Sequence, residues 1–375
     1  MMKTQRFTDN SLFRFLMVIL VPLAIILLVH FKAGNYYESI LILFFINLIL
    51  AASLNLTNGI TGIFSLGQAG FMALGAYIGS ILTLSESTKD TMVSKMPQWL
   101  KQFQLPFWAA LIVAACVTMI IAGIIGFAIL RAKGHYLAVI TLGMVIVIKS
   151  VLDNASSLTN GSRGISGMTK YSTLPVVIIT ALISLFILYR FRTSAYGRSM
   201  IALREDEDAA ASLGINHRTI RLMSFMISAF FAAVGGCLWA HLQRTIAPSL
   251  FYFDETFTIL EMSVLGGMAS LSGAIPGAAV LTFLPQLLAN FSTGFTIFGI
   301  HVPQINGLTN IVTSVLFIIM IIFRKEGITG SSEYLVGTLF SSSTYTGLFR
   351  KQTYLDFAHA FTRKNRSEKN KGEPQ

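Results

Sequence analysis

Apolar runs long enough to cross a lipid bilayer recur along this chain. The run at 173–190, for example, reaches Arg190 before it meets a charged side chain. A helix needs about 20 mostly apolar residues to cross the hydrocarbon core, where each backbone polar group must be satisfied within the protein. Charged residues make up 12% of the sequence, about half the share that is usual in soluble proteins. The sequence therefore predicts an all-α polytopic membrane protein.

We predict about ten transmembrane helices, some of them interrupted by glycine. The segment 256–268 is short and contains Gly266 and Gly267, so either a full or a partial crossing fits it. The other candidates approach the length of roughly 17–25 residues that a crossing needs. The ten candidates are 12–31, 40–57, 63–84, 107–130, 136–152, 173–190, 222–242, 256–268, 272–290 and 308–323.

Basic residues are distributed unevenly over the connections between these segments. With the N-terminus inside, the 28 Lys and Arg residues divide 20 to 8 between the inner and outer sides, as the positive-inside rule requires. We therefore predict that both termini, Lys133 and the loop 193–221 are cytoplasmic, and that 85–106 and 156–170 face out. This rule accounts for the net charge of +11, which gives no indication of nucleic-acid binding.

The sequence divides into a transmembrane domain, 1–323, and a basic tail, 324–375. The tail is rich in Ser and Thr and ends in the charged stretch KNRSEKNKGEPQ. A segment of this composition buries too little apolar surface to fold alone. We expect a cytoplasmic tail that is partly disordered.

The loop 193–221 carries nine ionisable side chains between two apolar segments. Residues 199–213 are rich in helix formers, and Gly214 is a natural helix stop. We predict a short helix on the cytoplasmic face whose acids and bases meet a partner. The alternative is a solvated loop without a partner.

Glycines and polar residues cluster inside several apolar segments. The pairs Gly75–Gly79 and Gly273–Gly277 have the GxxxG spacing that favours close helix packing. Polar side chains beside glycines at membrane depth indicate broken helices whose freed backbone faces a cavity. Six polar positions are predicted to line a path through the membrane, and the alternative is that they bond neighbouring helices. They are Asn55, Ser65, Gln68, Thr141, Asn154 and Thr159.

Motifs of several chemistries are absent from the sequence. It has no GxxxxGK[ST] loop, so we expect no ATPase site in this chain. It has no HExxH motif or Cys/His cluster, and we expect no metal, cofactor or catalytic residue. Ion-driven transporters usually carry conspicuous buried acids, for which Glu261 is the one candidate. This disfavours a stand-alone secondary transporter, and no filter sequence supports a channel.

Three segments, 54–77, 134–168 and 195–288, are similar to the membrane permease of the branched-chain amino acid ABC transporter family. The likeness is to the larger of its two permease subunits and covers roughly residues 40–323. Two patterns carry it, GR-x6-ED-x-x-AA-x3-GI and LGG-x-x-SLSG-x-x-PGA. The residues of the first are Gly197, Arg198, Glu205, Asp206, Ala209, Ala210, Gly214 and Ile215.

The resemblance implies a membrane-spanning permease subunit of an ABC importer, in a bacterial plasma (inner) membrane, with no enzyme activity of its own. It would carry branched-chain or other hydrophobic amino acids, driven by ATP hydrolysis on separate subunits. Its implied partners are a second permease subunit, two cytoplasmic ATPases, an extracytoplasmic substrate-binding protein and membrane lipid. The segment 199–213 would be its coupling helix. The implied ATPase-coupling residues are Gly197, Arg198, Arg204, Glu205, Asp206, Glu207 and Gly214.

Two departures from the family pattern fall in the expected substrate path. Gln68 stands where the family often has His, and Ser162-Arg163 stands where it often has Gly-Pro-Asn. Permeases for urea and short amides share the same scaffold. They remain an alternative, as does a stand-alone secondary transporter.

Overall fold

The computed structural model describes residues 35–93, 96–132, 134–292, 295–297, 300–302, 308–323 and 327–330. Residues 39–332 form one compact unit. Of the other unit, residues 1–38 and 333–375, the described part is the first turn of helix α4. The predicted span 12–31 and most of the predicted tail therefore lie outside the described residues.

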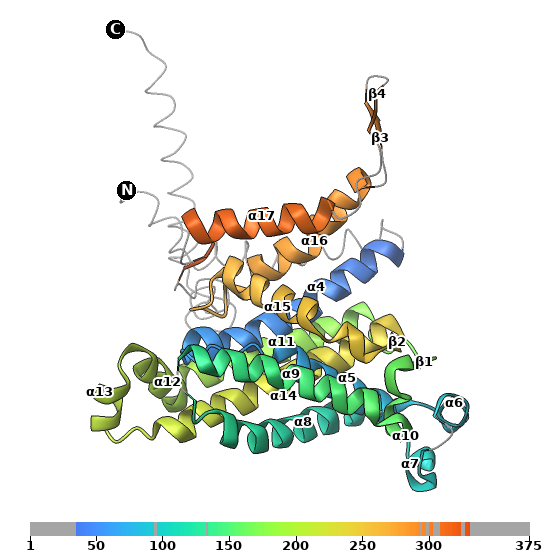
Figure 1. The fold of residues 1–375 in the computed structure, drawn as a ribbon, viewed down its shortest axis with the longest axis horizontal. Coiled ribbons are helices and arrows are strands. Elements are labelled where there is room, and N and C mark those ends of the chain that lie inside the picture. Colours follow the sequence, from blue (N-terminus) through green and yellow to red (C-terminus); the bar gives the residue numbers. More distant parts are fainter. Residues whose placement is uncertain are drawn as a thin grey trace, which may run out of the picture. The chain divides into compact units, whose positions relative to one another are not determined.

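Helices make up most of the described residues of the unit 39–332 (Figure 1). The longer ones are α4 (Asn35–Leu54), α5 (Gln68–Thr83), α8 (Phe107–Ile129), α9 (His135–Asn154), α11 (Leu174–Thr193), α12 (Ala195–Glu205), α14 (His217–Gln243), α15 (Phe253–Gly266), α16 (Ala274–Ser292) and α17 (Leu308–Phe323). The short helices are the π-helix η2 (Asn55–Ile60), α6 (Glu86–Met92), α7 (Gln98–Gln102), α10 (Ser156–Thr159), η3 (Gly161–Arg163), α13 (Glu207–Ser212) and η4 (Pro248–Leu250). Two small antiparallel pairs complete the described elements: β1 (Ile165–Ser166) with β2 (Thr245–Ile246), and β3 (Phe295–Ile297) with β4 (Ile300–Val302).

Five helical segments in the described part of the chain are long and apolar enough to cross a membrane. They are Tyr36–Ile60, Phe107–Ile129, Tyr136–Asn154, Leu174–Thr193 and His217–Gln243. Two further apolar helices, Gln68–Thr83 and Ala274–Leu288, are shorter. These helices support the predicted all-α, multi-pass membrane protein, whereas the total of ten spans stays a prediction.

Helix boundaries differ from the prediction where side chains or glycines set them. Within the predicted span 63–84, residues 63–67 are not helical, and the helix α5 begins at Gln68. α14 begins five residues before the predicted 222, because the Asn216 side chain accepts hydrogen bonds from the backbone N–H groups of Arg218 and Thr219. Such a cap satisfies donors that lack a partner in the first helical turn.

Glycines allow α5 and α14 to pack at backbone distance. A methyl group on Gly75 would lie 2.3 Å from the Cα of Ala233, and one on Gly236 would lie 2.0 Å from the backbone oxygen of Met72. A methyl group on Gly277 would lie 1.8 Å from the backbone oxygen of Met262, between α15 and α16. The close packing predicted at both GxxxG pairs is confirmed.

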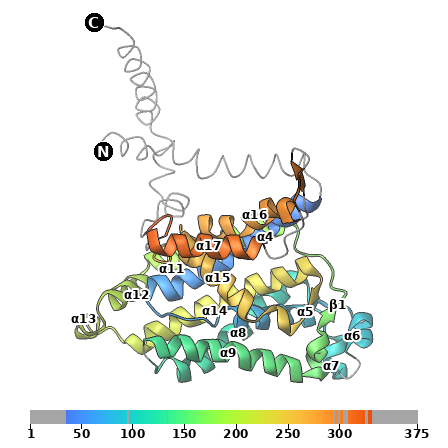
Figure 2. The ribbon, with the colours of Figure 1, turned by 45° about the horizontal axis from the view of Figure 1, so that its top comes forward.

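The two charged connections lie at opposite ends of the helices. α6 and α7 gather near β1 at one end, and α12 and α13 lie at the other (Figures 1 and 2). The first group is held by the buried Lys89, whose ammonium donates to the carbonyl oxygens of Leu100 at 3.0 Å and Phe103 at 2.7 Å. Burial lowers the pKa of Lys89, and the nearby Glu86 carboxylate partly opposes this shift. Which end faces the cytoplasm stays a prediction.

Residues 327–330, placed in the tail by the sequence, are packed against the link between α15 and α16. The backbone N–H groups of Ile328 and Thr329 donate to the carbonyl oxygens of Leu265 and Gly266 at 3.0 and 3.1 Å. The Thr329 hydroxyl donates to the same Gly266 oxygen at 2.9 Å. The described turn 327–330 therefore contacts the end of α15, and the predicted domain boundary at 323 stays a prediction.

Candidate functional site

The chain between α4 and α5 leaves regular helical geometry. η2 is a π-helical turn, and the next seven residues, 61–67, are not helical before α5 begins. Asn58 closes this break: its amide nitrogen donates to the Ser65 carbonyl oxygen, and its oxygen accepts from the Ser65 backbone N–H, both at 3.0 Å. Single π-helical turns occur often at functional sites. The predicted interruption is confirmed.

Asn55 joins this break to a second one, the link between α15 and α16. Its amide nitrogen donates to the Ser270 carbonyl oxygen at 2.7 Å, and its oxygen accepts from the Ser263 hydroxyl. The two backbones also meet at Gly59, where a methyl group would lie 1.6 Å from the carbonyl oxygen of Met268. The break at 55–67 and the link at 267–273 are therefore packed against each other. We call this contact region the crossing.

Gln68 and Thr141 attach other helices to the same crossing. The Gln68 amide nitrogen donates to the Ser53 hydroxyl in α4, and its oxygen accepts from the Ser228 hydroxyl of α14 at 3.2 Å. The Thr141 hydroxyl of α9 accepts from the Leu66 backbone N–H at 2.9 Å. A buried polar network of this kind fixes the arrangement of its members because leaving one unpaired is costly.

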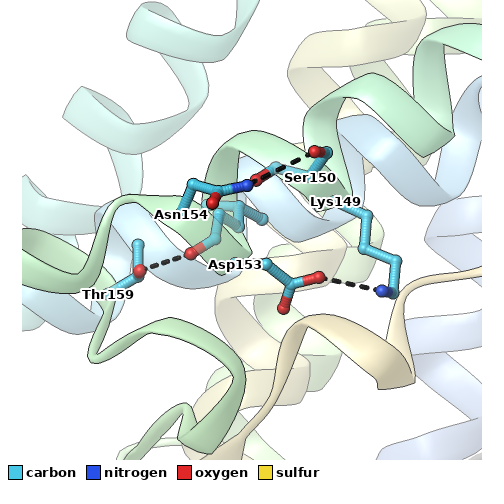
Figure 3. A network of polar contacts seen from close by, with 6 residues as sticks. Lys149, Ser150, Asp153, Asn154 and Thr159 are labelled. Carbon is cyan, nitrogen blue, oxygen red and sulfur yellow. Dashed lines mark hydrogen bonds and ion pairs between the residues drawn. The ribbon is translucent and has the colours of Figure 1, made fainter.

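The six predicted path residues therefore fall into two groups. Asn55, Ser65, Gln68 and Thr141 come together at the crossing, where all are buried and hydrogen-bonded within the chain. The remaining two lie near the other end of α9 (Figure 3). There the Asn154 amide donates to the Ser150 carbonyl oxygen at 2.8 Å, and the Thr159 hydroxyl donates to that of Leu152. Whether either group lines the path stays a prediction.

The prediction of one helix over 199–213 is wrong, because Asp206 interrupts it. Asp206 has the extended dihedrals φ −155° and ψ 113°. Its carboxylate accepts from the backbone N–H groups of Asp208 at 2.9 Å and Ala209 at 3.0 Å. The acid thus ends α12 and caps the start of α13. Gly214 has φ +81°, which confirms the predicted glycine stop.

Arg204 is exposed and also contacts the rest of the chain. Its guanidinium donates to the Gly59 carbonyl oxygen at 3.0 Å and pairs with the exposed Glu205. Glu207 is paired with Arg221 at 3.0 Å, where both side chains are mostly covered. Arg204, Asp206 and Glu207 thus have contacts within the chain, and Arg204, Glu205 and Asp206 are also exposed. Whether the four residues face a partner's charges stays a prediction.

The remaining predicted coupling residues shape the start of α12. A methyl group on Gly197 would lie 2.0 Å from the Arg192 carbonyl oxygen, so only glycine allows α12 to turn this closely from α11. The exposed Arg198 donates to the Thr193 carbonyl oxygen at 3.0 Å. Both residues hold the corner between the two helices.

Sequence reasoning missed the serines of α14 that face the crossing. The Ser228 hydroxyl donates to the Ser53 carbonyl oxygen at 2.7 Å, and Ser224 lies 2.7 Å from the Thr61 hydroxyl. Their spacing of four residues, which puts them on one helix face, was a usable signal. In the described part of the chain, no group of His, Cys, Asp and Glu is arranged to hold a metal ion.

Comparisons with known proteins agree on one family. A family model described as branched-chain amino acid transport system / permease component matches residues 36–323. The high-affinity branched-chain amino acid transport system permease protein LivM of Escherichia coli strain K12 is 29% identical over 317 residues, covering 76% of this chain and 67% of the relative. The permease protein LivH of Salmonella typhimurium is 24% identical over 308 residues, covering 76% and 91%. BraD of Pseudomonas aeruginosa is 27% identical over 176 residues, covering 46% and 52%. No solved structure matches the chain.

Proposed function

Because the chain belongs to the family of branched-chain amino acid transport system permease components, we propose that it is the membrane-spanning permease subunit of an ABC importer for branched-chain or other hydrophobic amino acids. The observation that carries the proposal is the extent of the family match, which runs from α4 to the end of α17. A second permease subunit, two cytoplasmic ATPases and an extracytoplasmic binding protein complete the importer. ATP is hydrolysed on the separate subunits, and both termini lie in the cytoplasm of a bacterial cell.

The crossing of the two interrupted helices is the proposed inner part of the path. Asn55, Ser65, Gln68 and Thr141 hold it together with interhelical hydrogen bonds, which average about 0.6 kcal/mol each in membranes. A conformational change that parts the two breaks has to offer these buried polar groups new partners. Asn154 and Thr159 belong to the proposed outer part.

α12 and α13 are the proposed coupling element, in place of a single coupling helix. The support is the direct contact from Arg204 to the Gly59 carbonyl oxygen, within η2. Gly59 in turn lies against Met268, in the link between α15 and α16. Displacing α12 therefore displaces both breaks, and the exposed side chains Arg198, Glu205 and Asp208 remain for contact with an ATPase.

Purification of the native complex tests the proposed function. An affinity tag on this chain should recover, from membranes of its own cell, two ATPase chains and a second permease, identified by mass. The binding protein encoded with them should bind leucine more tightly than urea or a short amide. Recovery of the chain without an ATPase would favour a secondary transporter, and preference for urea would favour the amide alternative.

A further inference from the structure

The end of α9 that carries Asn154, the outer end in the proposed topology, contains an ion pair whose partners both lie within one candidate membrane span. The Lys149 ammonium lies 2.8 Å from a carboxylate oxygen of Asp153, one helical turn further on (Figure 3). The two side chains keep 29% and 23% of their surface exposed. Both charges are therefore partly open on the surface of this chain. Ionisable groups inside a membrane span are costly and are functional candidates for that reason.

Helix stability gives no reason for this pair. A lysine four residues before an acid is the less favourable order on a helix. Asp153 also lies in the last turn of α9, where the helix dipole disfavours a negative charge. Replacing such a pair by apolar side chains of similar volume is often neutral or stabilising. The pair is therefore poorly suited to a purely structural role.

The neighbours of the pair leave polar and aromatic groups available. The Lys149 nitrogen lies 5.4 Å from the centre of the Tyr252 ring, which presents an apolar surface beside the charges. The Tyr77 hydroxyl is buried and has no hydrogen-bond partner among the described residues. Asp153 is close enough to act on that hydroxyl electrostatically. In contrast, the hydroxyl of Thr159 is already committed to a backbone oxygen.

We propose that Lys149 and Asp153 bind the zwitterionic head group of an amino acid cargo at the outer part of the path. The cargo carboxylate accepts from the Lys149 ammonium, and the cargo ammonium donates to the Asp153 carboxylate. This inference rests on the proposed function, in that the cargo is an amino acid. It adds that Lys149 and Asp153 recognise the ammonium and carboxylate groups, which all amino acid cargoes share.

Charge balance allows the ion pair between Lys149 and Asp153 to be replaced by ion pairs with the cargo, even where little water is present. The protein pair and the cargo head group are each neutral overall, so the bound state brings in no net charge. Burying an unpaired charge would be prohibitive, whereas each charge here keeps an opposite partner. When the cargo leaves, Lys149 and Asp153 close on each other again. The site is therefore weak and reversible, as a step in transport requires.

The test uses the complete importer in liposomes, with its ATPases, second permease and binding protein, and radiolabelled leucine. The main variant, Lys149→Met with Asp153→Leu, removes both charges and leaves no orphan charge. A second variant, Asp153→Asn, keeps the size and shape of the side chain. The matched control is Lys101→Met with Asp90→Asn, which removes another lysine–aspartate pair, 2.6 Å apart, between α6 and α7.

In both α9 variants, we expect the leucine transported per ATP hydrolysed to fall at least about tenfold, because charged hydrogen bonds to the cargo are lost. The control should transport normally, and all complexes should assemble in wild-type amounts. Normal transport by the apolar double variant would overturn the proposal. So would failure of both α9 variants to assemble, because the pair would then be structural. Leucine uptake by the wild-type importer is measured in parallel, so a failure of the proposed function is seen separately.

Discussion

Replacing Arg204 by methionine should uncouple ATP hydrolysis from transport. The guanidinium donates to the Gly59 carbonyl oxygen at 3.0 Å, across 145 positions of sequence. Its methylene chain also packs on the turn, since a methyl group on Gly62 would lie 2.9 Å from the Arg204 Cγ. Methionine keeps most of this packing and removes the donor.

A hydrogen bond to a charged group contributes about 1.5–3 kcal/mol, and every 1.4 kcal/mol corresponds to a factor of ten. Loss of the bond should therefore shift the equilibrium between coupled and uncoupled arrangements by roughly 10- to 100-fold. In the purified importer, leucine transported per ATP hydrolysed should fall by a similar factor. The ATPases should still co-purify, because the bond that is lost lies within this chain and the exposed side chains of Arg198, Glu205 and Asp208 are unchanged.

Two variants of α12 serve as controls. Arg198→Met removes an exposed arginine that donates to the Thr193 carbonyl oxygen near the corner of the same helix. Glu205→Gln removes the partner of Arg204 without removing its bond to Gly59. Because both side chains are proposed to contact an ATPase, both variants should lower the amount of ATPase that co-purifies. The leucine transported per ATP hydrolysed by assembled complexes should stay well above that of Arg204→Met. If Arg204→Met transports as much leucine per ATP as the wild type, α12 does not act on the crossing through the bond from Arg204 to Gly59.

Three further outcomes are expected. Gln68→Ala should lower the transport rate while the complex still assembles, because two interhelical bonds of about 0.6 kcal/mol each are a small loss; a loss of assembly alone would place Gln68 in packing. Gly59→Ala should destabilise the permease by about 1–3 kcal/mol or more, seen as a lower melting temperature, because its methyl group overlaps the Met268 carbonyl oxygen. In a cysteine-free background, Ser212→Cys should react with a membrane-impermeant reagent from the cytoplasm and Ser87→Cys from outside; external labelling of the first would reverse the topology.

Features that depend on local composition were predicted well. The span 107–130 corresponds to α8 at Phe107–Ile129, and 308–323 corresponds to α17. Hydropathy identifies such helices because the bilayer demands a run of apolar residues. The close approach at Gly75 was also predictable, because only the absence of a side chain permits it.

Features that depend on distant partners were not predicted. Nothing in the neighbourhood of Arg204 indicates that its guanidinium reaches Gly59. Asp206 was read as a partner-facing acid within a helix, whereas its carboxylate caps the next helix. An acid after a run of helix formers is compatible with either role, and tertiary contacts decide between them. The hydrogen bonds that Asn55 makes at the crossing likewise appear only when η2 and α15 are brought together.

ATP-dependent uptake of leucine into liposomes tests the central claim most directly. The liposomes would contain this chain with its second permease and ATPases, ATP enclosed on the ATPase side, and the binding protein outside with radiolabelled leucine. We expect accumulation against the leucine gradient that needs both ATP and the binding protein and that persists when ionophores remove all ion gradients. Uptake that does not require ATP and is lost when ionophores remove the ion gradients would contradict the assignment to an ABC importer.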